Sequence, residues 1–276
     1  MFIGFLTAPL RNWSFRKIVD WASANGFKGL EVLVSPKVKH IDVNKVLSGG
    51  AGEVKRLFSG KELKITSLAF YSMGILKDKT EQEFLSKVID AASILDIEVV
   101  CTLAGGPAEG KDKKQTLKED FPKVFWPLVD KAREHGLKIA LENWYATNLQ
   151  GLDHFQIAFK EIPDKTLGLN FDPSHLFWQQ IDYIEAVHRF GDRIHHTHAK
   201  DAEILSFKLR EVGVLGRGWW RYRIPGWGQI NWRAYITALM EIGYNYVLSI
   251  EHEDPFFGSE DGLIKGGKYL RELIGA

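Results

Sequence analysis

Short apolar runs alternate with helical patterns along the whole chain. The runs predict eight strands, at residues 2–6, 30–34, 65–70, 99–103, 139–142, 167–172, 194–198 and 247–251. Between them, apolar side chains recur at helical spacing, as in Phe84, Val88, Ala91 and Leu95. Eight strands that alternate with helices in 276 residues match the size and rhythm of a (β/α)₈ TIM barrel. We therefore expect a single α/β domain of this fold.

A glycine separates the helical pattern from the next apolar run in several of these units. It occurs in ANGFKGLEVLV, EHGLKIALENW, RFGDRIHHTHAK and EIGYNYVLSIEHE. We expect Gly26, Gly136, Gly191 and Gly243 to end helices with positive φ, because a residue without Cβ adopts that conformation cheaply. Residues 80–83, Thr-Glu-Gln-Glu, predict a capping box at a helix start.

The main alternative fold is a doubly wound open sheet. Its nucleotide-binding versions place a glycine-rich turn after the first strand, but LTAPLRNWS has no G-x-G-x-x-G, and the chain has no P-loop. The charge is balanced, with 36 basic and 35 acidic residues. This balance gives no electrostatic reason to expect nucleic acid or an anionic membrane as a partner, and it favours a small, weakly charged ligand.

The expected location is the cytoplasm. The start of the chain, MFIGFLTAPL, lacks a basic region, and its apolar run is too short for a signal peptide or a membrane span. The single cysteine, Cys101, cannot form an intramolecular disulfide and lies in an apolar run. We expect it to be a packed thiol in a reducing compartment.

Four successive strands end in a residue that can bind a metal: Glu142, Asp172, His198 and Glu251. In a TIM barrel the carboxyl ends of the strands meet at one rim, where the chemistry takes place. Carboxylates with one imidazole and no thiolate suit Mn²⁺, Mg²⁺, Co²⁺ or Zn²⁺. Three carboxylates would also repel one another unless a cation lay between them. The alternative is a rim of helix caps and salt bridges, since single acidic residues at strand ends commonly have those roles.

The segments LENW, FDPSH, HTHAKD, PGWGQINW and LSIEHE resemble motifs of the xylose isomerase-like TIM barrels. This group of sugar phosphate isomerases and epimerases includes ketose 3-epimerases, hydroxypyruvate isomerase and inosose dehydratase. The resemblance covers nearly the whole chain. It implies that Glu142, Asp172, His198 and Glu251 bind the metal, with Mn²⁺ as the expected ion. It also implies that Glu142 and Glu251 are catalytic, one removing a proton next to a carbonyl and the other returning it from the opposite face.

The resemblance also suggests substrate contacts. His175 would hydrogen-bond a substrate oxygen above the metal, although it could simply cap the following helix. Strand alternation places His196, His198 and Lys200 on one face. Lys200 would then touch substrate or pair with a rim carboxylate, while His196 would lie deeper as a packed, hydrogen-bonded residue.

Two further carboxylates lie near the predicted site. Glu31, in GLEVLV, resembles a common family position near the pocket. Glu253 would share the side of Glu251 if that strand continued, which would let it support the metal ligands. A solvated loop charge is the alternative for Glu253.

An insertion at about residues 202–228 follows the seventh strand and is rich in tryptophan and arginine. Its glycines and Pro225 exclude one long helix. Tryptophan faces pack against sugar rings and arginine donates to hydroxyls, so we expect this segment to overhang the site and Arg223 to bind substrate. The same aromatics could instead contact another subunit, in a homo-oligomer or with a partner.

The expected function is a divalent-metal-dependent sugar isomerase or epimerase that abstracts a proton next to a carbonyl and forms an enediolate. A lyase or dehydratase acting on a 3-keto-glycoside or keto-inositol would start from the same intermediate and then expel a leaving group. Endonuclease IV-like DNA repair is a remote alternative. The zinc centre of that enzyme family needs histidines at positions where this chain has LAFYS and CTLAGG. The motifs do not choose the sugar, its phosphorylation or the metal.

Overall fold

The computed structural model describes residues 1–38 and 40–275. Parallel strands close into one barrel in the order β1-β10-β7-β6-β5-β4-β3-β2. These eight strands are β1 (Phe2–Leu6), β2 (Gly29–Leu33), β3 (Lys64–Phe70), β4 (Val99–Leu103), β5 (Lys138–Glu142), β6 (Leu167–Phe171), β7 (Ile194–Ala199) and β10 (Val247–Ile250). The predicted single (β/α)₈ barrel is confirmed, and each predicted strand end lies within one residue of the observed one.

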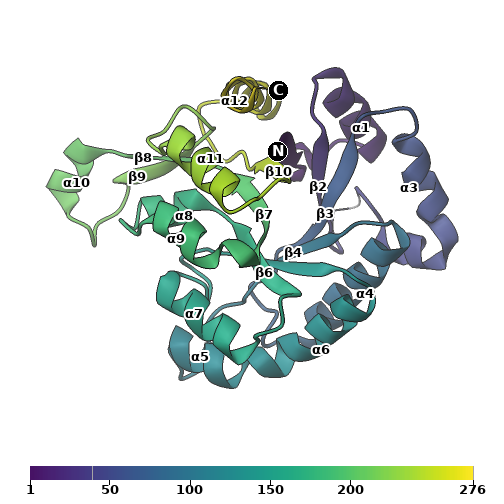
Figure 1. The fold of residues 1–276 in the computed structure, drawn as a ribbon, viewed down its shortest axis with the longest axis horizontal. Coiled ribbons are helices and arrows are strands. Elements are labelled where there is room, and N and C mark those ends of the chain that lie inside the picture. Colours follow the sequence, from purple (N-terminus) through teal and green to yellow (C-terminus); the bar gives the residue numbers. More distant parts are fainter. Residues whose placement is uncertain (39, 276) are drawn as a thin grey trace.

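Helices surround the barrel (Figure 1). They are α1 (Phe15–Ala24), α2 (Val43–Lys45), α3 (Ala51–Leu57), α4 (Lys79–Ile94), α5 (Lys113–Glu119), α6 (Phe121–Glu134), α7 (Leu152–Glu161), α8 (Pro173–Phe177), α9 (Tyr183–Phe190), α10 (Ser206–Val212), α11 (Trp232–Glu241) and α12 (Ser259–Ile274), with short turns at Ala8–Leu10, Val46–Gly50 and Gly191–Arg193. The α4 helix buries Leu85, Val88 and Ile89 on the face toward the barrel. Asp78 caps α4 by accepting from the Thr80 backbone, so the capping box predicted at Thr80 was wrong.

Three of the four predicted glycine helix ends are confirmed: Gly26, Gly136 and Gly243 have φ of 73°, 70° and 75°. Gly191 is different, because its φ is −57° and it begins a 3₁₀ turn. A Cβ built there would lie 2.8 Å from the Ile242 side chain. Glycine at this position therefore permits a close approach between the end of α9 and the end of α11, and positive φ is not needed.

The insertion forms a hairpin instead of an irregular loop. Strands β8 (Asp201–Ile204) and β9 (Trp220–Arg223) pair antiparallel, with α10 between them. In Figure 1 this arm extends away from the barrel. Asp201 anchors its base, since its carboxylate accepts from the Trp232 indole at 2.8 Å and from backbone N–H groups of Ala202, Gly226, Gly228 and Ile230.

The barrel interior becomes polar toward the carboxyl ends of its strands. Glu31, Asn170, His196 and His198 are all fully buried there. Buried polar groups are retained only where they are hydrogen-bonded or bind a ligand. This layer supports the candidate site. In the part of the chain that the structure describes, no helix is both long and apolar enough to cross a membrane.

Candidate metal centre

The structure brings the four predicted metal ligands together. Glu142 ends β5 and His198 lies in β7, while Asp172 and Glu251 directly follow β6 and β10. One ligand atom from each lies within 4.8 Å of the other three. His198 Nδ1 is 3.0 Å from Glu251 Oε2, 3.4 Å from Glu142 Oε1 and 3.7 Å from Asp172 Oδ2.

Two buried atoms of this group fit a metal ion particularly well. Asp172 Oδ2 and His198 Nδ1 make no well-formed hydrogen bond among the described residues, although Lys200 Nζ pairs with Asp172 Oδ2 at 3.1 Å and Glu251 Oε2 lies 3.0 Å from His198 Nδ1. A buried polar atom without a well-formed hydrogen bond costs free energy, so such atoms are suited to bind a ligand. Three carboxylates and one imidazole are a suitable donor set for a divalent cation. These four residues can therefore hold a metal ion.

Asp172 is both a helix cap and a candidate ligand. Its Oδ1 accepts from the Ser174 backbone N–H at 2.7 Å, at the start of α8. The Asn143 side chain fixes the same residue, accepting from its N–H and donating to its carbonyl, each at 2.8 Å. Asp172 can thus be a helix cap and a metal ligand at the same time, because one carboxylate oxygen caps the helix and the other faces the cluster.

Glu31 orients His198 from the side opposite the cluster. His198 Nε2 lies 3.2 Å from Glu31 Oε2, and Ser249 Oγ donates to that oxygen at 2.7 Å. Burial acts to raise the pKa of Glu31, but the charges of His198 and His196 outweigh it and lower the pKa to about 2. An ionised Glu31 accepts a hydrogen bond from the Nε2 side of the ring, which leaves Nδ1 facing the cluster.

Lys200 places a buried ammonium beside the same carboxylates. Its Nζ is 2.5 Å from Glu251 Oε2, 3.1 Å from Asp172 Oδ2 and 3.1 Å from Glu253 Oε2. Burial acts to lower the pKa of Lys200, but Asp172, Glu251 and Glu253 raise it well above its usual range. Lys200 is therefore a permanent cation that pairs with rim carboxylates, and it also lines the cavity above them.

The two predicted catalytic glutamates differ in electrostatics. Burial acts to raise the pKa of Glu142, but the hydrogen bond from His175 and the nearby His198 and Lys200 bring it well below its usual range. Burial raises the pKa of Glu251, and Lys200 and His198 offset this only in part. Adjacent carboxyl groups whose pKa values are pushed apart are typical of acid and base pairs.

A cavity of about 230 Å³ lies over the cluster and is lined by both glutamates, Lys200, His175 and several aromatic side chains. His175, in α8, has Nε2 3.3 Å from Glu142 Oε1 and Nδ1 3.0 Å from the Tyr222 hydroxyl. Sequence reasoning missed Tyr222, which the arm delivers to the cavity. The aromatic content of the insertion was the only signal for it.

Arg223 takes a different position from the one expected of a substrate contact. Its Nε donates to Asp254 Oδ2 at 2.7 Å and its Nη1 to Glu203 Oε2 at 3.0 Å. It does not line the cavity over the cluster. Successive residues of a strand point to opposite faces, so Tyr222 reaches the cavity while Arg223 braces the arm from the other side.

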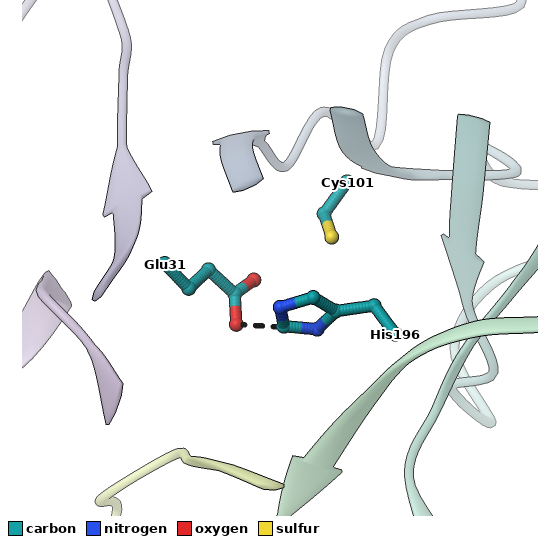
Figure 2. Close-up of side chains that lie close together, drawn as sticks. All are labelled: Glu31, Cys101 and His196. Atoms are coloured by element: carbon teal, nitrogen blue, oxygen red, sulfur yellow. Dashed lines mark ion pairs between the residues drawn. The ribbon is translucent and has the colours of Figure 1, made fainter. Parts of the chain in front are cut away.

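Figure 2 shows a second group inside the barrel, in which Glu31, Cys101 and His196 point toward one another from β2, β4 and β7. Both His196 nitrogens already have partners, Asn170 Oδ1 at 2.9 Å and Thr66 Oγ1 at 3.2 Å. Burial raises the pKa of the Cys101 thiol well above its usual range. His196 and Cys101 are therefore packed residues, as expected, and this group forms the layer beneath the candidate centre.

Comparison with known proteins agrees with this architecture. Residues 19–273 match the family model described as xylose isomerase-like TIM barrel. The chain belongs to this family. Its relatives include "Uncharacterized protein YfiH" of Bacillus subtilis (strain 168), 27% identical over 99% of each chain. "Inosose dehydratase" of Clostridium botulinum (strain Alaska E43 / Type E3) is 25% identical over 94% of this chain and 89% of its own.

Solved structures show the same fold. The IOLI protein with a binding zinc atom superposes with a TM-score of 0.79 at 20% identity, covering 100% of this chain and 98% of its own. A D-tagatose 3-epimerase-like protein gives 0.78 at 20% identity, covering 100% and 97%. The chain thus belongs to a xylose isomerase-like family and has inosose dehydratases among its relatives.

Proposed function

We propose that this protein is a divalent-metal-dependent sugar isomerase or epimerase that moves a proton next to a carbonyl through an enediolate. The observation that carries the proposal is the cluster of Glu142, Asp172, His198 and Glu251 beneath a cavity, in which one ligand atom from each residue lies within 4.8 Å of the other three. In this proposal the protein binds a small sugar as its substrate and does not act on nucleic acid.

Glu142, Asp172, His198 and Glu251 would hold the metal, for which we propose Mn²⁺, with Mg²⁺, Co²⁺ and Zn²⁺ as the other candidates. When bound, the ion supplies Lewis acidity that favours loss of a proton next to the substrate carbonyl. The zinc atom in the IOLI structure supports a divalent ion in a protein of this fold.

In this proposal the chain's own residues move the proton. Glu142 has a lowered pKa and is ionised, so it accepts the proton. Glu251 has a raised pKa and can carry the proton that is returned. His175, at 3.3 Å from Glu142 and buried in the cavity wall, is placed to donate to a substrate oxygen.

A dehydratase or lyase is the second candidate function. Its support is the likeness to inosose dehydratases along 94% of the chain. The first proton transfer would be the same, and a leaving hydroxyl or aglycone would then take up a proton. Tyr222 and His175, which lie 3.0 Å apart at the cavity wall, are placed to supply it.

The test is proton exchange in D₂O, followed by NMR with Mn²⁺-loaded protein and a panel of ketoses, 3-keto-glycosides and keto-inositols. We expect deuterium next to the carbonyl of one substrate, with inversion or isomerisation. Glu142→Gln and Glu251→Gln should each lower the rate at least about 100-fold. The exposed helix residue Glu83 provides a matched control, because Glu83→Gln makes the same chemical change at a residue that does not line the cavity.

Release of water or an aglycone together with exchange would assign the protein to the lyases. Exchange that persists at the normal rate in both cavity variants would contradict the proposed proton transfer. Metal binding without exchange on any substrate would contradict the function while leaving the metal centre in place.

A further inference from the structure

The cavity over the candidate centre has an unusual balance of charge. Glu142, Glu251 and Glu253 line it, with Asp172 directly below. Among the described residues that line the cavity, Lys200 is the single lysine or arginine. Four carboxylates therefore face one ammonium, and even a divalent ion at the centre would leave no excess positive charge for an anionic substrate.

The Lys200 ammonium already pairs with carboxylates of the protein. Its Nζ contacts Asp172, Glu251 and Glu253 at 3.1, 2.5 and 3.1 Å. The Tyr222 ring covers the ammonium from another side, with its centroid 4.5 Å away. A phosphate or carboxylate on the substrate would have to displace one of these partners in order to reach it.

The arginines of the arm and the nearby helix end are also committed. Arg221 and Arg223 of the arm both pair with Glu203, at 2.8 and 3.0 Å, and Arg223 also pairs with Asp254. The amino end of α8 opens beside the cluster, but Asp172 Oδ1 already caps it. This arrangement differs from phosphate sites, where free N–H groups and cations converge on the ligand.

Glu253 stands apart from the other carboxylates. Its side chain is 48% exposed, whereas those of Glu142 and Glu251 are 8% and 14% exposed. It lines the cavity without belonging to the four-residue metal group. An incoming ligand therefore meets this carboxylate before it reaches the buried centre, and like charges repel.

The remaining cavity wall is aromatic. Trp144, Tyr145 and Tyr222 line it, and such faces pack against the C–H faces of a polyol ring. The volume of about 230 Å³ is below the roughly 300–1,000 Å³ of pockets for drug-sized ligands. One ring of monosaccharide size suits this space.

We propose that Glu253 is a specificity-determining residue that restricts the site to uncharged polyol substrates and excludes their phosphorylated or carboxylated analogues. It does so in two ways, by occupying the Lys200 ammonium and by placing a negative charge at the cavity entrance. This inference rests on the proposed function only in taking the substrate to be a polyol with a carbonyl. The selection against charged ligands by Glu253 does not depend on which reaction follows.

The experiment measures ligand binding without turnover. The whole metal-loaded protein is titrated by calorimetry with matched pairs, such as D-fructose and D-fructose 6-phosphate, or myo-inositol and its monophosphate, together with inorganic phosphate. We expect the wild type to bind the uncharged member of at least one pair at least about tenfold more tightly. In Glu253→Gln that preference should fall at least about fivefold, mainly because the phosphate ester binds more tightly.

Two controls separate charge from packing. Glu253→Asp keeps the negative charge and should keep most of the preference. Glu83→Gln removes an exposed carboxylate on α4 and should leave the preference unchanged, which excludes an effect of net charge alone.

The inference is overturned if wild type binds the phosphorylated members as tightly as the uncharged ones, if no uncharged member binds, or if Glu253→Gln leaves the ratio unchanged. A preserved charge preference in a protein that catalyses no proton exchange would contradict the proposed function and support the role of Glu253. Proton exchange on a phosphorylated sugar would support the proposed function and contradict the role of Glu253.

Discussion

At the scale of single residues, Glu31 decides how His198 presents its imidazole. Glu31→Gln removes the carboxylate that faces Nε2 at 3.2 Å, so the ring loses both its orientation and its negative partner. We expect metal affinity to fall about 10- to 100-fold, as for other second-layer partners of metal-bound histidines. Titration of metal-free protein with Mn²⁺ or Zn²⁺ measures this. Unchanged affinity in a folded Glu31→Gln protein would show that Glu31 does not prepare the site.

Lys200 partly replaces a metal in neutralising the buried carboxylates. Lys200→Met keeps much of the side-chain volume but leaves Asp172 and Glu251 without their cation. We expect metal-free protein to lose about 3 to 5 kcal/mol of unfolding free energy, because breaking a buried ion pair leaves uncompensated charge. Added divalent metal should restore a larger part of the melting temperature in the variant than in wild type. Thermal unfolding with EDTA and with Mn²⁺ tests both parts, and equal melting temperatures in EDTA would contradict the argument.

At the scale of elements, the β8–β9 arm depends on the buried Asp201 carboxylate. This side chain accepts from the Trp232 indole and from backbone groups after β9. Asp201→Ala leaves these donors without an acceptor, so we expect a loss of about 2 to 4 kcal/mol and faster proteolysis within residues 205–228. Because the arm carries Tyr222, ligand affinity should also fall. Asp192→Ala, on the exposed surface, is the control, and a variant arm as resistant as that of wild type would contradict the role of Asp201.

The strands and the four clustered residues could be predicted because each depends on local sequence. An apolar run fixes where a barrel strand lies, and its last residue then lies at the rim whichever helix follows. The arm was beyond such reasoning, since the Trp-Arg-Tyr-Arg alternation of β9 spans only four residues, too few to identify a strand among the neighbouring glycines. Alternation predicts that Tyr222 and Arg223 point apart, but only tertiary packing decides which of them faces the cavity. The local sequence also could not explain Gly191. Glycine is needed there because the Ile242 side chain, which is far away in the sequence, packs against it.

At the scale of the whole molecule, stability should fall with acid. His195 faces outward from β7, with Nε2 2.9 Å from the Lys165 carbonyl, and burial followed by the charge of Lys138 lowers its pKa to about 4. The folded protein thus binds this proton more weakly than the unfolded chain, whose pKa is about 6.5. The stabilising contribution is complete above pH 6.5 and is lost as pH falls through 4.

His195→Gln removes this titration while keeping a donor for the Lys165 carbonyl. We expect its unfolding free energy to depend less on pH between 6.5 and 4, by about 1 to 2 kcal/mol over the interval. Urea unfolding across this range measures the difference. His196, whose pKa is also lowered to about 4 by burial, titrates equally in both proteins and sets the common background. Parallel curves for the two proteins would contradict the assignment.

The position of β10 in the barrel has a consequence for synthesis on the ribosome. This strand pairs with both β1 and β7, whose other edges pair with β2 and β6, so it closes the gap between them. Until Val247–Ile250 has left the exit tunnel, the nascent chain carries two open parallel edges, and such edges invite association with other chains. The barrel therefore cannot close until residue 250 has emerged from the ribosome, and we expect chaperones that shield strand edges to bind the nascent chain until then.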